Sequence, residues 1–397
     1  MLETGLPETG LVETGLVETG LLDDVRERLA AAPGQLSPHR VAEAMRAAGR
    51  PVGDATVLAV HDALRRDVLG SGPLEPLLRQ PGVTDVLVNG ADQVWVDDGA
   101  GLRLTSVRFG DDAAVRRLAQ RLASTGGRRL DDATPYADVR LPDGTRFHAV
   151  LAPTARPGTT ISLRVPAAKA FSLDELVAAG SVSPDCAEVL RALMSARLAF
   201  LVSGGTGSGK TTLLAALLSL ADPTERLVLV EDASELRPDH DHVLGLEARP
   251  PNIEGAGEIT LETLVRQALR MRPDRLVVGE VRGAEVVDML AALNTGHAGG
   301  CGTLHANSVA DVPARIEALA AAAGLPRAAA HSQLGAALDA VVHLSRSRDG
   351  RRFVAQIGVP VRGADGLVSI VTALEFDVDG RTQRGPSSAL LAARLSS

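Results

Sequence analysis

The sequence is poor in aromatic residues, which make up 2% of its 397 residues. Proteins that bind single-stranded nucleic acid stack successive bases on several exposed aromatic rings. The net charge is −8, whereas a nucleic-acid-binding surface is normally basic. We therefore expect no direct contact with nucleic acid, although a local basic channel can exist on an acidic protein.

Cysteines and long apolar runs are scarce as well. The two cysteines, Cys186 and Cys301, cannot form a disulfide framework and are typical of a reducing compartment. No apolar run approaches the roughly 18 residues that a membrane-spanning helix needs. The first residues carry Glu3, Glu8 and Glu13 and lack the basic and apolar regions of a secretory signal. We therefore expect a cytoplasmic protein.

Lysine is nearly absent, and one of the two lysines, Lys210, lies in a glycine-rich motif. The segment GGTGSGKT at 204–211 fits the P-loop pattern G-x-x-x-x-G-K-[ST] and stands between a strand-like and a helix-like run. Glycines in such a loop let successive backbone N–H groups face a phosphate, and the following helix presents its positive end. We predict that Lys210 reaches the β- and γ-phosphates of a nucleotide and that the Thr211 hydroxyl binds Mg²⁺. The predicted nucleotide-binding residues are Gly204, Gly205, Thr206, Gly207, Ser208, Gly209, Lys210, Thr211 and Thr212.

The first part of the chain divides into four predicted segments. Residues 1–22 repeat Glu-Thr-Gly-Leu with a period that fits neither a helix nor a strand, which predicts a disordered leader or, alternatively, a docking tail. Residues 23–69 have helical patterns, with a helix start at Ser37. Residues 70–168 contain short β-like runs, hairpin-type turns and a helix, which predict an α+β N-terminal domain. We interpret residues 169–183 as a linker.

Residues 184–397 predict a domain of the α/β class. Strand-like runs alternate with helix-like runs, and the strand-like runs are continuously apolar, as in parallel strands that helices cover on both faces. A helix over 261–271 places its apolar residues on one face and ends before a proline. Three runs near the C-terminus, 341–344, 353–359 and 367–376, predict an antiparallel extension of the sheet.

Acidic residues follow two of the strand-like runs. The run LVVG at 276–279 leads to Glu280, in the form of a Walker B strand, and the run LVLV at 227–230 leads to Glu231, with Glu235 one turn further. Ligands of a parallel sheet gather at the carboxyl ends of its strands, so we expect these carboxylates to face the same crevice as the P-loop. Phosphoryl transfer needs such groups around Mg²⁺ and the attacking water. The alternative for each is a carboxylate that only caps a strand at the surface.

A glycine-rich segment over 295–308 contains two histidines. On a helix, His297, Cys301 and His305 would share a face and suggest a zinc site, but four glycines within the segment argue against a helix. We favour a neutral histidine that donates a hydrogen bond near the γ-phosphate and senses the nucleotide state. Histidines whose hydrogen bonds are satisfied within a packed loop are the alternative.

These motifs occur in the same order as in the bacterial type II/IV secretion ATPases, and the sequence resembles that family. The matching segments are the P-loop (Walker A), EDASEL at 231–236 (Asp box), GEVRG at 279–283 (Walker B) and TLHANS at 303–308 (the end of the His box). Segments 72–78, 83–90 and 140–146 agree, and the resemblance is greatest to the CpaF-type motor of tight-adherence (Flp) pili. The sequence departs at Ala298 and Gly302, where polar residues are common in the family, and lacks the four-cysteine zinc site of some type II secretion relatives.

The resemblance implies an α+β N-terminal domain and a RecA-like P-loop motor domain, with ATP bound between them. It implies that Thr211 and Glu280 hold Mg²⁺ and that Glu231 and Glu235 are the candidates for orienting the water. The implied catalytic residues are Glu231, Glu235, Glu280, Arg282, His297 and His305. Arg140, Arg146 and Arg164 lie in segments from which family members direct arginines at the nucleotide, with surface salt bridges as the alternative.

The resemblance also implies a homohexameric ring that hydrolyses ATP to power assembly of a tight-adherence pilus or type II/IV secretion. Such a ring works on inner-membrane platform proteins, which implies a peripheral position at the inner face of the cytoplasmic membrane. The alternative is the motor of a conjugation or DNA-transfer system, which uses the same ATPase core. The acidic composition argues against direct contact between this chain and DNA.

Overall fold

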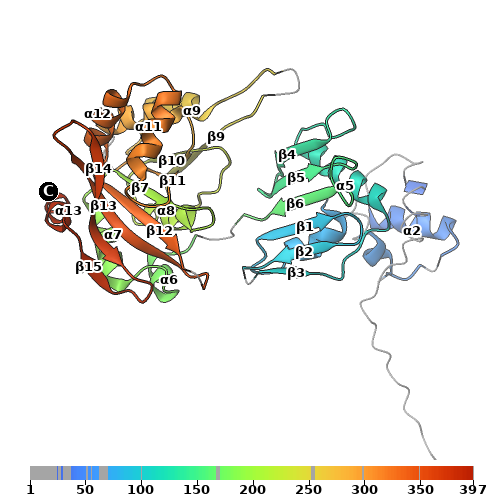
Figure 1. Cartoon of the computed structure of the whole chain (residues 1–397). Coiled ribbons are helices and arrows are strands. Elements are labelled where there is room, and N and C mark those ends of the chain that lie inside the picture. Colours follow the sequence, from blue (N-terminus) through green and yellow to red (C-terminus); the bar gives the residue numbers. More distant parts are fainter. Residues whose placement is uncertain are drawn as a thin grey trace, which may run out of the picture. The chain divides into compact units, whose positions relative to one another are not determined.

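The computed structural model describes residues 25, 28–29, 37–50, 52–54, 56–61, 70–99, 101–166, 170–251, 255–296, 299–347 and 349–396. Contacts within the chain divide it into two compact units, residues 1–166 and 167–397 (Figure 1). The predicted leader over 1–22 lies outside the described residues. No helix in the described ranges combines the length and the apolar character needed to cross a membrane.

A small helical region precedes the sheet of the first unit. Helix α2 (Pro38–Ala47) begins where the sequence predicts, because the Ser37 hydroxyl accepts a hydrogen bond from the Arg40 N–H at 3.4 Å. Its buried face, with Val41 and Met45, packs with Val60 in a separate apolar cluster. The helix start predicted at Ser37 is therefore confirmed.

The first unit contains a six-stranded sheet in the order β3-β2-β1-β6-β5-β4, in which every neighbouring pair is antiparallel. Its elements are η1 (Gly72–Leu74), α4 (Glu75–Leu78), β1 (Asp85–Asn89), β2 (Val94–Asp97), β3 (Leu102–Leu104), α5 (Asp112–Thr125), β4 (Tyr136–Arg140), β5 (Arg146–Val150) and β6 (Thr160–Arg164). This is the α+β composition that the sequence predicts for this region.

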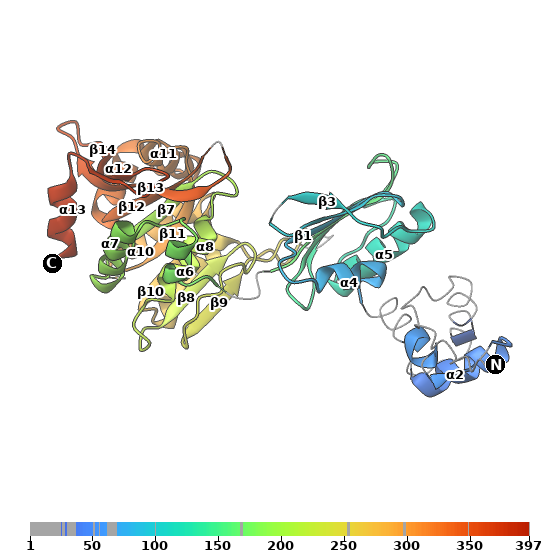
Figure 2. The same cartoon turned by 90° about the horizontal axis from the view of Figure 1, so that it is seen from below.

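One face of this sheet is covered and the other is open. Side chains alternate between the faces along each strand, so that Val86 and Val88 of β1 are buried whereas Asp85 and Leu87 are only partly covered. Helix α5 packs its buried side chains, among them Leu118, onto the covered face. Figure 2 shows α4 and α5 on this same side of the sheet. The open face thus presents charged side chains beside apolar ones.

The second unit is built on a nine-stranded sheet in the order β15-β14-β13-β12-β7-β11-β10-β8-β9. Strands β9, β8, β10, β11, β7 and β12 run parallel, and β13 to β15 continue the sheet in antiparallel fashion. Its elements are α6 (Leu173–Ala178), α7 (Pro184–Ser195), β7 (Phe200–Gly204), α8 (Lys210–Leu218), β8 (Leu227–Glu231), β9 (Val243–Glu247), α9 (Leu261–Ala268), η2 (Leu269–Met271), β10 (Arg275–Val281), α10 (Glu285–Asn294), β11 (Cys301–His305), α11 (Val312–Ala322), α12 (Arg327–Ala337), β12 (Ala340–Arg346), β13 (Arg352–Arg362), β14 (Val368–Phe376), β15 (Thr382–Arg384) and α13 (Ser388–Leu395).

Helices cover this sheet on both faces, as the continuously apolar strands predict. One apolar core joins α6, α7 and α8 to the sheet, and Leu190 and Leu217 lie in it. A second core joins α9, α10, α11 and α12 to the opposite face, with Val265 and Leu290 in it. All five residues of β8 are buried, which requires cover on both sides.

Two local findings differ from the sequence predictions. Within the stretch interpreted as a linker, 169–183, the chain forms α6, and Leu173 is buried in the second unit. A capping box between Ser172 and Glu175 stabilises this short helix, which is too short for its periodicity to be recognised in sequence. The run over 341–344 lies in β12, which pairs in parallel with β7 and antiparallel with β13, so the parallel part of the sheet extends one strand further than predicted.

Candidate nucleotide site

The P-loop connects the end of β7 to the start of α8, as its sequence context predicts. Gly209 has φ +96°, a left-handed conformation that strains residues with a side chain. A Cβ at Gly204 would lie 2.6 Å from Ser208 Oγ and 2.7 Å from the Leu344 carbonyl oxygen, so this position has room for glycine alone. The two glycines therefore shape the loop for different reasons, one by backbone conformation and one by close packing.

Lys210 lies folded onto this loop. Its side chain is largely buried, and Nζ donates to the carbonyl oxygens of Gly204 at 3.1 Å and Gly205 at 3.0 Å. Burial lowers the pKa of Lys210, and the negative charge of Glu280 opposes that shift. The Lys210 ammonium group is thus held at the mouth of the loop by two backbone carbonyl groups.

The loop has the features that a phosphate requires. Helix α8 follows it directly, and no described side chain caps its N-terminus. The Ser208 hydroxyl is buried and has no hydrogen-bond partner among the described residues. Unsatisfied donors at a helix N-terminus beside a buried lysine form an anion site. The residues present therefore fit the phosphates of a nucleotide.

The acidic motifs reach the same edge of the sheet as the P-loop, because β7, β11, β10 and β8 are neighbours and run parallel. Arg282 connects the two motifs. Its Nη2 lies 2.5 Å from Glu280 Oε2 and its Nη1 lies 3.7 Å from Asp232 Oδ2. The hydrogen bond to Glu280 is the main cause of the raised pKa of Arg282. Arg282 thus links the Walker B motif to the Asp box, a contact that the spacing in sequence does not reveal.

Glu231 and Glu235, the two candidates for orienting water, have different surroundings in the structure. Glu231 is buried, and its Oε1 accepts from the backbone N–H groups of Glu235 and Leu236, both at 2.9 Å. Its side chain also fills the space beside Gly279, where a Cβ would lie 2.7 Å from Glu231 Cγ. Glu235 is exposed at the end of this turn. Glu231 therefore holds the Asp box in shape, whereas the Glu235 side chain is open to solvent.

Replacing Glu231 with Gln should leave the protein at least as stable as the wild type at neutral pH. Burial raises the pKa of Glu231, while its two N–H bonds oppose the shift. The folded protein then holds this proton more tightly than the unfolded chain, so the stabilisation is complete in acid and is lost as pH rises through the folded-state pKa. Gln keeps an acceptor for both N–H groups and carries no charge. Calorimetric Tm values should show an advantage of Glu231→Gln that grows from acidic to neutral pH.

The matched variant for this measurement is Glu231→Ala, which leaves both N–H groups without their acceptor. It should lower the free energy of unfolding by about 2 kcal/mol at neutral pH, the cost of buried unsatisfied donors. If Gln and Ala destabilised the protein equally, the carboxylate would not serve as the acceptor that orders the Asp box.

Of the two histidines in the glycine-rich segment, His305 lies within the described residues. His305 ends β11 and is in register with Gly204, the first P-loop glycine, as expected for a group near the phosphates. Thr303 on the same strand donates to the Gly279 carbonyl oxygen at 2.7 Å and joins this strand to the Walker B strand. His297 lies outside the described residues.

The zinc alternative is wrong for the residues that the structure describes. Cys301 and His305 stand at opposite ends of β11, about 13 Å apart at the rise of an extended strand. Burial raises the pKa of Cys301 to about 12, which disfavours a thiolate ligand. No group of three or more potential metal-binding side chains gathers within the described ranges.

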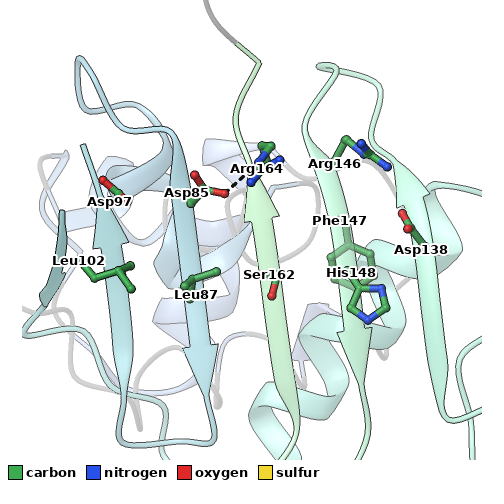
Figure 3. A pocket seen from close by; sticks show the side chains of 10 residues that line it. All are labelled: Asp85, Leu87, Asp97, Leu102, Asp138, Arg146, Phe147, His148, Ser162 and Arg164. Atoms are coloured by element: carbon green, nitrogen blue, oxygen red, sulfur yellow. Dashed lines mark hydrogen bonds and ion pairs between the residues drawn. The ribbon is translucent and has the colours of Figure 1, made fainter. Parts of the chain in front are cut away.

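The three arginines of the first unit form a row, which sequence reasoning did not anticipate. Arg140 pairs in register with Arg146, and Arg146 with Arg164, on three adjacent strands of the sheet. Figure 3 shows Arg146 and Arg164 near the same edge of the sheet, with Arg164 Nε 3.1 Å from Asp85 Oδ1. A hollow of about 540 Å³ lies beside Arg146 and Arg164 on the open face, and three carboxylates, Asp85, Asp97 and Asp138, line it as well. The salt-bridge alternative is therefore realised for Arg164.

Comparison with known proteins supplies the family. A model of the type II/IV secretion system proteins matches residues 67–364. A Mycobacterium tuberculosis (strain CDC 1551 / Oshkosh) protein provisionally named as a conjugal transfer protein is 57% identical over 332 residues, covering 82% of this chain and 94% of its own. The conjugal transfer protein TrbB of Rhizobium radiobacter is 34% identical over 226 residues, which are 56% of this chain and 67% of TrbB.

A solved structure supports the fold. The ATPase DotB of Legionella pneumophila superposes with a TM-score of 0.50 at 21% identity, covering 72% of this chain and 79% of DotB. The predicted RecA-like fold is confirmed by this likeness together with the mixed α/β architecture. With the family match extending across both units and the P-loop, Asp box and Walker B motif on one sheet edge, this chain belongs to the type II/IV secretion system ATPase family.

Proposed function

We propose that this chain is the ATP-hydrolysing subunit of a transport motor. The observation that carries the proposal is the strand order of the second unit, in which the parallel neighbours β7, β11, β10 and β8 bring the P-loop, the Walker B motif and the Asp box to one edge of the sheet. Magnesium-bound ATP supplies the γ-phosphoryl group and the positive charge that stabilises its transfer. Lys210 binds the β- and γ-phosphates, and Thr211 and Glu280 hold the metal ion. Glu235 orients the attacking water, within an Asp box that Glu231 keeps in shape.

The remaining residues have supporting roles in this proposal. His305, in register with Gly204, responds to the γ-phosphate and passes the nucleotide state to its strand. Arg282 holds the acidic motifs together and keeps their charges balanced. His297 is proposed from its motif alone. Arg140, Arg146 and Arg164 are proposed to bind the nucleotide from the first unit, on the resemblance of their segments to the family.

Different observations support two proposals for the transport system in which this ATPase works. The relatives named for conjugal transfer, one of them 57% identical, support a motor for DNA or protein transfer. The resemblance of the motifs to CpaF supports assembly of a tight-adherence pilus. In both cases we propose a homohexamer in the cytoplasm that docks on inner-membrane platform proteins. The acidic net charge favours a motor that acts through those partners without touching DNA.

A Lys210→Ala allele in the native host distinguishes a transfer motor from a pilus-assembly motor. Loss of plasmid transfer with normal surface pilin supports the transfer motor, whereas loss of surface pilin with normal transfer supports the pilus motor. Salt-sensitive stimulation of ATP hydrolysis by DNA would contradict the absence of direct DNA contact.

The enzymatic part of the proposal is tested with Glu280→Gln. Removing the charge of the metal-binding carboxylate should lower kcat for ATP hydrolysis about a hundredfold, since the metal ion supplies much of the stabilisation of the transferring phosphoryl group. Phosphate release by purified protein at saturating Mg²⁺ and ATP measures it. Asp365→Asn, which changes an exposed loop carboxylate, serves as the control and should retain the wild-type rate. A Glu280→Gln enzyme as active as this control would contradict the assignment.

A further inference from the structure

A buried histidine outside all four family motifs lies against the base of the P-loop. His343 belongs to β12 and is in register with Ser203, the residue that precedes the first P-loop glycine. The His343 Nδ1 lies 2.9 Å from Ser203 Oγ, and both side chains are fully or almost fully buried. The pair is separated by 140 residues in sequence.

The imidazole also lies near the segment that follows His305. The backbone of Asn307 is close enough to the ring to raise its pKa.

The surroundings of His343 favour the neutral form of its imidazole ring. Burial is the main cause of the lowered pKa of His343, with the positive charge of Lys210 acting in the same direction and Asp311 opposing it. A neutral imidazole keeps one ring nitrogen as an acceptor, which matches the Ser203 hydroxyl beside Nδ1.

The backbone of β12 approaches the loop at the same point. The Leu344 carbonyl oxygen would lie 2.7 Å from a Cβ at Gly204, so there is no space between this strand and the first P-loop residue. The register of β12 with β13 shifts between His343 and Leu344, and such irregularities re-aim side chains in a strand. Strand β12 therefore supports the P-loop from the side opposite to β11.

We propose that His343 is a positioning residue of the nucleotide site, which ties the base of the P-loop, through Ser203, to β12 beside the segment that follows His305. This inference rests on the proposed ATPase function. The bridge holds His305 in a fixed relation to the phosphates, so that the loop that binds the nucleotide and the histidine that responds to it move together. Because Lys210 and the loop backbone still bind phosphate without the bridge, its loss affects the chemical step more than binding.

The test replaces His343 with Phe, which fills a similar volume but makes no hydrogen bond to Ser203. We expect kcat for ATP hydrolysis to fall about five- to tenfold, the equivalent of one hydrogen bond, with KM for ATP changed less than about twofold. Ser203→Ala, which removes only the hydroxyl, and His343→Gln, which keeps a polar group beside Ser203, should each retain more activity than His343→Phe.

His331 provides a matched control in the same unit. It is equally buried, its Nδ1 accepts from the Val368 N–H at 2.8 Å, and its Nε2 lies 3.2 Å from Glu317. His331→Phe should lower Tm but keep kcat well below that Tm. An unchanged kcat in His343→Phe, or an equal loss of kcat in both variants, would overturn the proposal.

Wild type and Lys210→Ala are measured alongside to separate this inference from the proposed function. If the wild type hydrolyses ATP and Lys210→Ala does not, the ATPase assignment stands and the His343 variants decide the inference alone. A wild type that hydrolyses no more ATP than Lys210→Ala would overturn the proposed function and the inference with it.

Discussion

Replacing Lys210 with Ala should reduce ATP hydrolysis about a thousandfold, because an ammonium group placed against the transferring phosphates is one of the largest electrostatic contributions in such a site. Lys210 is the only lysine among the residues that the structure describes. Lys169, the other lysine of the chain, lies far from the motif in sequence, and Nζ of Lys210 is anchored between the carbonyls of Gly204 and Gly205. Arginine should not rescue the loss, since Lys210 is only 9% exposed and the bulkier guanidinium would have to displace the loop.

The measurement is phosphate release by the purified protein, together with nucleotide binding by calorimetry. Arg191→Ala is the control, because Arg191 pairs with Asp174 on the surface of the same unit. It should keep the wild-type rate. Hydrolysis by Lys210→Ala at more than a tenth of the wild-type rate would show that the P-loop lysine is not the phosphate-binding group.

Replacing Arg275 with Met should lower the free energy of unfolding by about 3–5 kcal/mol, the cost of leaving a buried charge without its partner. Arg275 is 1% exposed, its Nε donates to Glu225, and its Nη2 donates to the Met194 carbonyl oxygen at 2.9 Å. Its Nη1 lies 3.4 Å from the Gly299 carbonyl oxygen, so the same guanidinium holds the chain just before β11. Arg197 also pairs with Glu225, which places the expected loss nearer the lower end of this range.

Urea denaturation measures this prediction, with the surface variant Arg191→Ala as the comparison. An exposed ion pair such as Arg191–Asp174 should contribute less than about 1 kcal/mol. The double variant Arg275→Met with Glu225→Gln should recover part of the loss, because it removes the unpaired charge. A loss in Arg275→Met no larger than that in Arg191→Ala would contradict a buried ion pair at this position.

Much of the site was predictable because its motifs are local. The P-loop glycines act through backbone conformation and close packing, and both leave a pattern within eight consecutive residues. The acids after the apolar runs were predictable for a similar reason, since a parallel sheet brings the carboxyl ends of its strands to one edge. Strand order then confirmed that the runs ending at Glu231 and Glu280 are neighbours.

The other features of the site depend on burial and on strand register, and neither can be inferred from the spacing of residues in the sequence. The sequence alone does not distinguish the roles of Glu231 and Glu235, because both are glutamates in the same motif. The structure shows that Glu231 is buried and accepts hydrogen bonds from two backbone N–H groups. The in-register row of Arg140, Arg146 and Arg164 needed the strand pairing.

The sequence by itself predicted a phosphate-binding loop around Lys210 and determined that the second unit is a largely parallel sheet covered by helices, because these properties follow from consecutive residues and from periodicity. Only the tertiary structure decided which distant side chains lie beside the loop. Ser203 and His343 lie 140 residues apart in the chain and meet because β12 adds to the sheet beside β7. The physical reason is that hydrogen bonds form between neighbours in space, and strand order determines which distant residues become neighbours.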